Sequence, residues 1–236
     1  MSHERSVRWV SLGRMDYDEA LAIQTRQAER LLQGEDEAQT VFAVEHPPTI
    51  TVGRSGTFDH ILAGRERLRD MGVEVREVDR GGDVTYHGPG QWVLYPVLHL
   101  APWGNDIGRY VRMLEEVVIR ALAEVGITGD RVKEYPGVWV GRDKVCAIGV
   151  RARRRTSGEF VTYHGLALNV NTNLAHFNLI VPCGIADRGV TSVQRLLGRE
   201  QPFSEWEARL RAAFNAVFLE DGADVDVAAD EAAEAR

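Results

Sequence analysis

The chain has 236 residues, 44% of them hydrophobic, which fits one domain with a full core. Its formal net charge of −7 argues against a general nucleic-acid footprint. The two cysteines are too few for a disulfide framework, the first residues lack an apolar signal-peptide core, and no apolar run reaches the roughly 20 residues that span a bilayer. We therefore expect a cytoplasmic protein with no membrane and no nucleic-acid partner.

Hydrophobic spacing and turn residues predict the secondary structure of the whole chain. In chain order we expect a strand over 7–12, a helix over 16–34, strands over 40–46 and 49–53, a helix over 65–72, a strand over 73–80, two β-type runs within 83–100, a helix over 106–126, strands over 137–141, 144–152 and 159–170, and helices over 191–198 and 204–220. The strands at 40–46 and 49–53 are expected to pair, and Ser204 and Glu207 to form a capping box.

Clustered strands with helices between them favour an α+β fold over a regular βαβ array. We expect a central mixed, largely antiparallel sheet flanked by helices, in a single domain over residues 1–220. Residues 221–236 are rich in Ala, Asp and Glu and have little apolar surface to bury. We expect this acidic tail to be disordered.

The glycine-rich segment over 79–91, "DRGGDVTYHGPGQ", concentrates residues that suit a binding site. Gly81 and Gly82 precede a predicted strand, whereas phosphate-binding loops of nucleotide sites precede a helix. Paired glycines still let the backbone approach a ligand, and Arg80 can hold an anion or a carbonyl. A tight hairpin with a structural His87 would give a similar pattern. The combination of these residues favours the site.

Cys183 lies between a proline and a glycine in "IVPCGI", where a bend can present a thiol. A free thiol has a pKa near ~8.5, so a nucleophilic cysteine needs a nearby cation or base. The candidates are His87, His164 and Lys144. Only Lys133 and Lys144 among the 28 Lys and Arg residues are lysines, and lysine can release a proton where arginine cannot. The alternative is that Lys144 is a solvated hairpin residue.

Two further features leave alternatives open. Cys146 follows Lys144 by two residues, so we expect both on one face of the same strand. A cysteine inside an apolar strand is more often a small buried hydrophobe, so it ranks below Cys183 as a nucleophile. The basic run Arg151–Arg155 is either a solvated strand end or a docking patch for an acidic partner protein.

Five stretches together resemble one known family, in the family's order and spacing. They are "EHPPTITVGR" (45–54), "RGGDVTYHGPGQWVLYP" (80–96), "KVCAIGVR" (144–151), "YHGLALNVN" (163–171) and "IVPCGI" (180–185). The family is the lipoyl(octanoyl) transferases, or octanoyl-[acyl-carrier-protein]:protein N-octanoyltransferases, which are related to lipoate and biotin protein ligases. Each stretch alone is modest, whereas the ordered set is highly specific.

The resemblance implies a lipoate/biotin protein ligase-like α+β fold and a cysteine–lysine acyltransferase. By motif, Cys183 is the nucleophile and Lys144 is the amine that lowers its pKa. The implied substrate-binding residues are Arg80, Gly81, Gly82, Asp83, Val84, Thr85, Tyr86, His87, Ala147, Ile148, Gly149, Gly165, Leu166 and Ala167. The family varies at the position of Asp83, so we expect that contact through the backbone.

The resemblance also implies the partners. The octanoyl group comes from octanoyl-acyl carrier protein, and it goes to a lysine on the lipoyl domains of 2-oxoacid dehydrogenase E2 subunits and on the glycine cleavage H protein. No ATP, metal or other cofactor is expected, because a thioester is already activated. Two alternatives stay open: an ATP-dependent lipoate or octanoate ligase, which needs no cysteine nucleophile, and a non-catalytic acyl-carrier-binding module with an inert Cys183.

Overall fold

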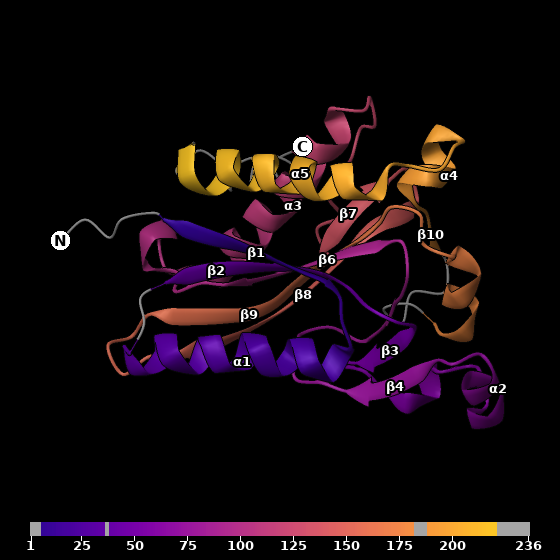
Figure 1. Cartoon of the computed structure of the whole chain (residues 1–236), viewed down its shortest axis with the longest axis horizontal. Coiled ribbons are helices and arrows are strands. Elements are labelled where there is room, and N and C mark those ends of the chain that lie inside the picture. Colours follow the sequence, from indigo (N-terminus) through magenta and orange to yellow (C-terminus); the bar gives the residue numbers. More distant parts are fainter. Residues whose placement is uncertain (1–5, 36–37, 182–187, 221–236) are drawn as a thin grey trace, which may run out of the picture.

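A computed structural model of the chain describes residues 6–35, 38–181 and 188–220. Cys183 and the acidic tail therefore lie outside the described residues. Two sheets organise this part of the chain (Figure 1). The larger sheet has the strand order β1 (Val7–Arg14), β2 (Gln39–Glu45), β6 (Gln91–Val97), β9 (Phe160–Asn169), β8 (Asp143–Arg154) and β10 (Gly189–Val190), with β7 (Gly137–Val140) also paired to β8. The smaller sheet has the order β4 (Glu74–Glu77), β3 (Thr49–Val52) and β5 (Val84–His87).

Strand directions in the larger sheet are mixed. The pairs β2–β6, β6–β9, β8–β9 and β7–β8 are antiparallel, whereas β1–β2 and β8–β10 are parallel. Helices cover the sheet, so the predicted α+β class with a mixed, largely antiparallel sheet is confirmed.

The larger sheet separates two apolar cores (Figure 1). On one side it packs against α3 (Ile107–Ala123) and α5 (Phe203–Asn215), which continues into a π-helical turn (Ala216–Glu220). On the other side it packs against α1 (Tyr17–Gln33). Gly34, with φ 71°, ends α1 where the sequence predicted the end of this helix, and Asp16 caps its start. Within the described residues, no helix is both long enough and apolar enough to cross a lipid bilayer.

The smaller sheet and the short helices near it form a third core. The short helices are η1 (Phe58–His60), η3 (Leu174–Leu179) and α2 (Arg65–Asp70). Two other short helices, η2 (Ala101–Trp103) and α4 (Val193–Leu197), pack against the first core instead. Ile50, Val84, Tyr86 and Phe177 are buried in this third core. Because β5 directly follows the glycine-rich turn in the sequence, the packing of β5 in this core holds the turn against the larger sheet.

Two local predictions were wrong. The strands β2 and β3 do not pair: β2 lies between β1 and β6, and β3 lies in the other sheet between β4 and β5. Pro47 and Pro48 lack the positive-φ residues of a two-residue hairpin, so the chain crosses between sheets at this point. The capping box is also absent, because α5 begins at Phe203 with Pro202 at its N-cap. Glu207 instead accepts hydrogen bonds from Trp9 Nε1 at 2.9 Å and Ser11 Oγ at 3.1 Å.

Candidate active site

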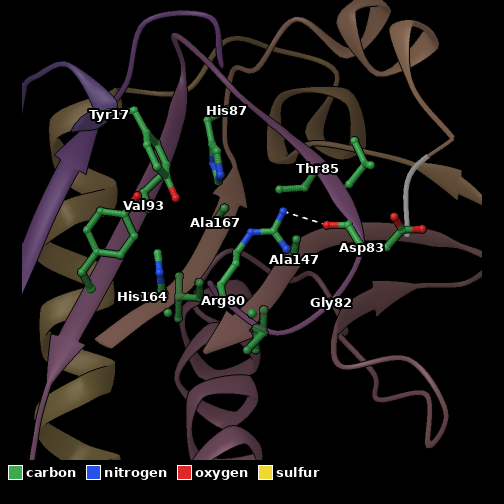
Figure 2. Close-up of a pocket in the computed structure, with 16 residues that line it drawn as sticks. Tyr17, Arg80, Gly82, Asp83, Thr85, His87, Val93, Ala147, His164 and Ala167 are labelled. Carbon is green, nitrogen blue, oxygen red and sulfur yellow. Dashed lines mark hydrogen bonds between the residues drawn. The ribbon is translucent and has the colours of Figure 1, made fainter. Parts of the chain in front are cut away.

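A pocket lies between the face of the larger sheet and the glycine-rich turn (Figure 2). Strands β6, β8 and β9 supply one wall, and β5 with the turn at 80–83 supplies the other. Twelve of the fourteen predicted substrate-binding residues line it: Arg80, Gly82, Asp83, Val84, Thr85, His87, Ala147, Ile148, Gly149, Gly165, Leu166 and Ala167. Three stretches far apart in the sequence are therefore brought together around one cavity.

The remaining two predicted residues lie outside the lining of this pocket. Gly81 donates its backbone N–H to Val150 O at 2.9 Å, which ties the turn to β8. Tyr86 is buried in the third core, where its hydroxyl lies 2.6 Å from His176 Nδ1 and its ring contacts Phe177. Burial raises the pKa of Tyr86 to about 12. Tyr86 thus supports the wall of the pocket from behind.

Two paired glycines allow the turn to approach the sheet. Gly149 of β8 pairs with Gly165 of β9. A Cβ on Gly149 would lie 2.7 Å from Gly81 O, and a Cβ on Gly165 would lie 2.1 Å from Leu94 O. Both positions therefore require glycine for a steric reason: Gly149 leaves room for the turn, and Gly165 leaves room for β6.

Arg80 holds the turn and contributes a cation to the pocket. The side chain is 7% exposed. One terminal nitrogen donates to Thr51 O at 2.8 Å and to Asp83 O at 2.9 Å, and the other donates to Gly81 O at 3.0 Å. Figure 2 shows the guanidinium beside Ala147 and Asp83. The carboxylate of Asp83 points to His60, whose Nδ1 lies 2.6 Å from it, so the backbone of Asp83 is the part bound to Arg80.

His87 is a neutral member of a directed hydrogen-bond chain. The amide nitrogen of Gln91 must donate to Tyr86 O at 3.0 Å, so the amide oxygen accepts from His87 Nδ1 at 2.9 Å. Burial is the main cause that lowers the pKa of His87 well below its usual range. Gln91 also donates to Asn169, and Asn169 donates to Thr191 O at 3.1 Å. Thr191 N then donates to Lys144 O at 2.9 Å, which links the pocket to the strand end that carries Lys144.

His164 lines the pocket with one ring nitrogen that lacks a hydrogen-bond partner among the described residues. Its Nε2 lies 2.9 Å from Asp79 Oδ1, and its Nδ1 is the buried atom without a partner. The bond from His164 lowers the pKa of Asp79 to about 2, so an ionised carboxylate holds the proton on Nε2. Burial lowers the pKa of His164 itself. The residue has φ 57°, a conformation uncommon outside glycine.

Four lining residues were not among the predicted substrate-binding residues: Tyr17, Val93, Tyr95 and His164. Val93, Tyr95 and His164 lie inside the quoted motifs, and Val93 and Tyr95 share a strand face by alternation. The sequence could therefore have identified these three residues. Tyr17 begins helix α1 and had no such signal. Its ring stacks on His87 with centroids 5.6 Å apart, and burial raises the pKa of Tyr17 to about 12.

Lys144 stands at the start of β8, next to β7 and β10, and is 8% exposed. Its Nζ donates to Pro136 O at 3.3 Å and lies 4.7 Å from the centroid of the Trp139 ring. It is therefore not a solvated hairpin residue. Val190 pairs with Lys144, so β10, which begins six residues after Cys183, lies directly beside this lysine. The contact between Cys183 and Lys144 falls on residues outside the described part and stays a prediction.

Cys146 is a buried core residue, which agrees with its lower rank as a nucleophile. It is fully buried among the residues of the first core, and burial raises the pKa of its thiol. The expectation that Cys146 shares a strand face with Lys144 rests on strict alternation. A bulge between β7 and β8 places Val145 and Cys146 in the same core, so alternation does not hold across this point.

Among residues 6–35, 38–181 and 188–220, no group of three or more His, Cys, Asp and Glu side chains is arranged to hold a metal ion. The pocket is apolar along Val84, Ile148 and Leu166 and carries neutral histidines and one arginine. Such a lining combines apolar surface with a few polar groups, as the lining of small-molecule sites does.

The mixed α+β domain and its partly apolar pocket define a protein that binds a small ligand. The sequence pattern of the family "Lipoyl protein ligase A/B catalytic domain" matches residues 16–215. The chain belongs to this family, as the motifs predicted.

Relatives with curated names agree with this membership. An octanoyltransferase of Chloroflexus aggregans is 50% identical over 216 residues, covering 91% of this chain and 96% of the relative. An octanoyltransferase of Caldicellulosiruptor saccharolyticus is 47% identical over 206 residues, covering 86% of this chain and 85% of the relative.

Solved structures share the fold at low identity. Lipoate-protein ligase A bound with ATP superposes with a TM-score of 0.70 at 16% identity, covering 90% of this chain and 85% of that one. A bipartite lipoate protein ligase from Thermoplasma acidophilum, studied with its E2 lipoyl domain, gives a TM-score of 0.69 at 15% identity, covering 92% and 84%. The predicted ligase-like fold is therefore confirmed.

Proposed function

We propose that this chain is an octanoyltransferase that moves an octanoyl group from octanoyl-acyl carrier protein to a lysine of a lipoyl domain. The observation that carries the proposal is the single pocket built by three motifs, in a chain that is 50% identical to an octanoyltransferase along nearly its whole length. The group rests between the two partners as a thioester on Cys183. The acceptors are the lipoyl domains of E2 subunits and the glycine cleavage H protein.

The first half-reaction loads the enzyme. The amine of Lys144 takes the proton from the thiol of Cys183, and the thiolate attacks the carbonyl carbon of the donor thioester. A carbon–sulfur bond forms to Cys183 and the carbon–sulfur bond to the donor breaks. The ammonium of Lys144 returns the proton to the departing donor thiolate, so charge and protons balance.

The second half-reaction transfers the octanoyl group from Cys183 to the acceptor. The acceptor lysine attacks the thioester on Cys183 as a neutral amine, and a carbon–nitrogen bond replaces the carbon–sulfur bond. Its surplus proton passes through Lys144 to the thiolate of Cys183, which restores the starting state. The low exposure of Lys144 and its contact with Trp139 support this role, because they hold the amine in one place at the start of β8.

The pocket accounts for recognition of the acyl chain. Ala147, Ile148, Leu166 and Ala167 come from two adjacent antiparallel strands and offer apolar surface. Each methylene buried there contributes about 0.8 kcal/mol, so a chain of eight carbons contributes several kcal/mol. His87 and His164 are neutral, because burial lowers the pKa of both, and so place no charge against the chain.

Mass spectrometry of the full chain tests the proposal. The protein is incubated with octanoyl-acyl carrier protein in the absence of ATP, digested at low pH and searched for an octanoyl adduct. We expect the adduct on the peptide that carries Cys183, its loss in Cys183→Ala, and its retention in the matched control Cys146→Ala. A lipoyl domain added afterwards should remove the adduct and gain the octanoyl mass.

The same experiment separates the alternatives. Octanoylation of the lipoyl domain that needs free octanoate and ATP, with no adduct on Cys183, would identify a ligase. Binding of the donor with neither an adduct nor transfer would identify a non-catalytic module. Either outcome overturns the transferase proposal.

A further inference from the structure

An open groove runs along the edge of the larger sheet next to Lys144. Its walls come from β10, from η3 and the residues after it, and from the segment after η1. Leu62, which is 62% exposed, Phe177 and Ile180 make it partly apolar, and Arg188 and Arg195 line it as well. A second groove adjoins the first, because both share Leu174 and Arg195, and Arg199 lines the second.

Three arginines follow one another along these two grooves. Arg188 lines only the first groove, Arg195 lines both, and Arg199 lines only the second. Arg195 and Arg199 are exposed, and no described carboxylate lies within salt-bridge distance of their side chains. Asp143 also lines the first groove, at its Arg188 end, where it pairs with Gly189. At the other end Arg195 and Arg199 form no ion pair within the described residues, and cations gathered there on a chain of net charge −7 indicate a local site for an anion.

The Arg188 end of the groove reaches the proposed catalytic lysine. The guanidinium carbon of Arg188 lies 5.0 Å from the centroid of the Trp139 ring, and Lys144 Nζ lies 4.7 Å from the same centroid. The two cations are therefore at most about 10 Å apart. A ligand that lies in the groove with one end at Arg188 has that end beside the reaction, and its other end extends toward Arg195 and Arg199.

We propose that this groove binds the phosphopantetheine arm of the thioester donor, with Arg195 and Arg199 holding its phosphate. The inference rests on the proposed function, which requires a donor whose thioester reaches Lys144 on a flexible arm. Such an arm has a thioester at one end, an apolar and amide-bearing middle and a phosphate at the other end. Arginine matches phosphate oxygens with paired, charge-assisted hydrogen bonds. Leu62 and Phe177 contact the middle of the arm.

The test compares three donors that carry the same octanoyl thioester: octanoyl-acyl carrier protein, octanoyl-phosphopantetheine and octanoyl-pantetheine. The variants are Arg195→Glu, Arg199→Glu and the matched control Arg211→Glu, which makes the same charge change at an exposed position on α5. We measure kcat/KM for acylation with each donor. The preference for octanoyl-phosphopantetheine over octanoyl-pantetheine should fall about 10-fold or more in the first two variants, since charged hydrogen bonds are lost. Arg211→Glu should keep the preference of the unmodified chain.

Each outcome decides the matter. A fall in preference that appears with both phosphate-bearing donors supports the groove as the phosphate site. A fall confined to octanoyl-acyl carrier protein would mean that the arginines meet acidic side chains of the carrier, and an equal preference in all variants would mean that the groove does not bind the donor; both overturn the inference. Acylation of Cys183 by octanoyl-pantetheine keeps the proposed function intact in those cases, whereas absence of any adduct from all three donors would overturn the function itself.

Discussion

The ammonium nitrogen of Lys144 lies 4.7 Å from the centroid of the Trp139 indole. Trp139 is 1% exposed and pairs with Lys144 across β7 and β8. An indole ring attracts a cation and, being rigid, fixes where the cation stands. The tryptophan therefore holds the amine at the start of β8, next to β10.

Replacing Lys144 by arginine separates the charge of this residue from its ability to carry a proton. Arginine keeps the positive charge but does not release a proton in proteins. Since a positioned acid–base group contributes about 100-fold or more, turnover should fall by at least that factor. The measurement is kcat for octanoyl transfer, with Lys133→Arg as the control because it changes the only other lysine. Near-normal turnover in Lys144→Arg would show that the residue acts through its charge alone.

A methyl group on Gly149 should disturb the pocket without unfolding the chain. The added Cβ would lie 2.7 Å from Gly81 O, so the glycine-rich turn must move away from β8. Because misplacement by about 1 Å can cost on the order of 100-fold, kcat/KM for the donor should fall steeply in Gly149→Ala. Gly64→Ala is the control, since a Cβ there meets no atom within 4 Å and its φ is −65°. Equal kcat/KM in the two variants would contradict the placement of the turn.

The pocket wall illustrates what the sequence could predict. Gly149, Gly165 and Gly81 stand within recognisable motifs, so their proximity to a ligand was predictable. The steric reason for glycine at 149 and 165 was not predictable. A Cβ at these positions would lie 2.7 Å from Gly81 O and 2.1 Å from Leu94 O, and only the folded backbone brings these carbonyl groups there. Tyr86 shows the converse, because alternation along β5 turns it into the third core although its neighbours Thr85 and His87 face the pocket.

The strand pairings show a second limit. A local pattern identifies β2 and β3 as strands but does not say which sheet each joins, because pairing is decided by distant partners such as β6 and β5. The capping box predicted for Ser204 and Glu207 was wrong for a similar reason. The carboxylate of Glu207 accepts hydrogen bonds from Trp9 and Ser11 of β1, which are distant in the sequence, and does not cap its own helix.

Stability should fall as the pH drops from about 6.5 toward 4, and His46 should account for part of the slope. Its Nδ1 donates to Met15 O at 2.9 Å, and its Nε2 accepts from the hydroxyl of Tyr95 at 2.8 Å. Burial lowers the pKa of His46 to about 4 in the folded chain. In this pH window the unfolded chain therefore binds a proton at His46 that the folded chain does not bind. The free energy of unfolding is largest above pH 6.5 and falls by up to about 1.4 kcal/mol per pH unit below it.

Urea unfolding at pH 7, 6 and 5 checks this sign. The variant His46→Gln is less stable at every pH, because it loses buried hydrogen bonds. Its free energy of unfolding should nevertheless depend less steeply on pH than that of the unmodified chain, since glutamine does not titrate. The steepness is the informative readout, because a purely structural loss shifts the free energy equally at each pH. Parallel slopes would show that His46 already titrates normally in the folded chain.

Charge reversal in the basic run Arg151–Arg155 should leave donor recognition almost unchanged. Arg151 lies 3.5 Å from the carboxylate of Asp79, Arg153 is paired with Glu29, and Arg154 stacks on the ring of Phe160. The run also ends β8, whereas Lys144 begins this twelve-residue strand. These arginines lie at the far end of the strand and already have partners. We expect them to attract an acidic carrier only weakly, because partner groups and salt screen their charge.

The double variant Arg153→Glu/Arg154→Glu measures this directly. Its KM for octanoyl-acyl carrier protein should stay within about twofold of the unmodified value, since exposed pairs contribute little. Some loss of stability is expected from the broken pair with Glu29, so KM is compared at a temperature where both proteins are folded by circular dichroism. A rise in KM as large as that of Arg195→Glu would place the carrier on the basic run and would reopen the docking-patch alternative for this segment.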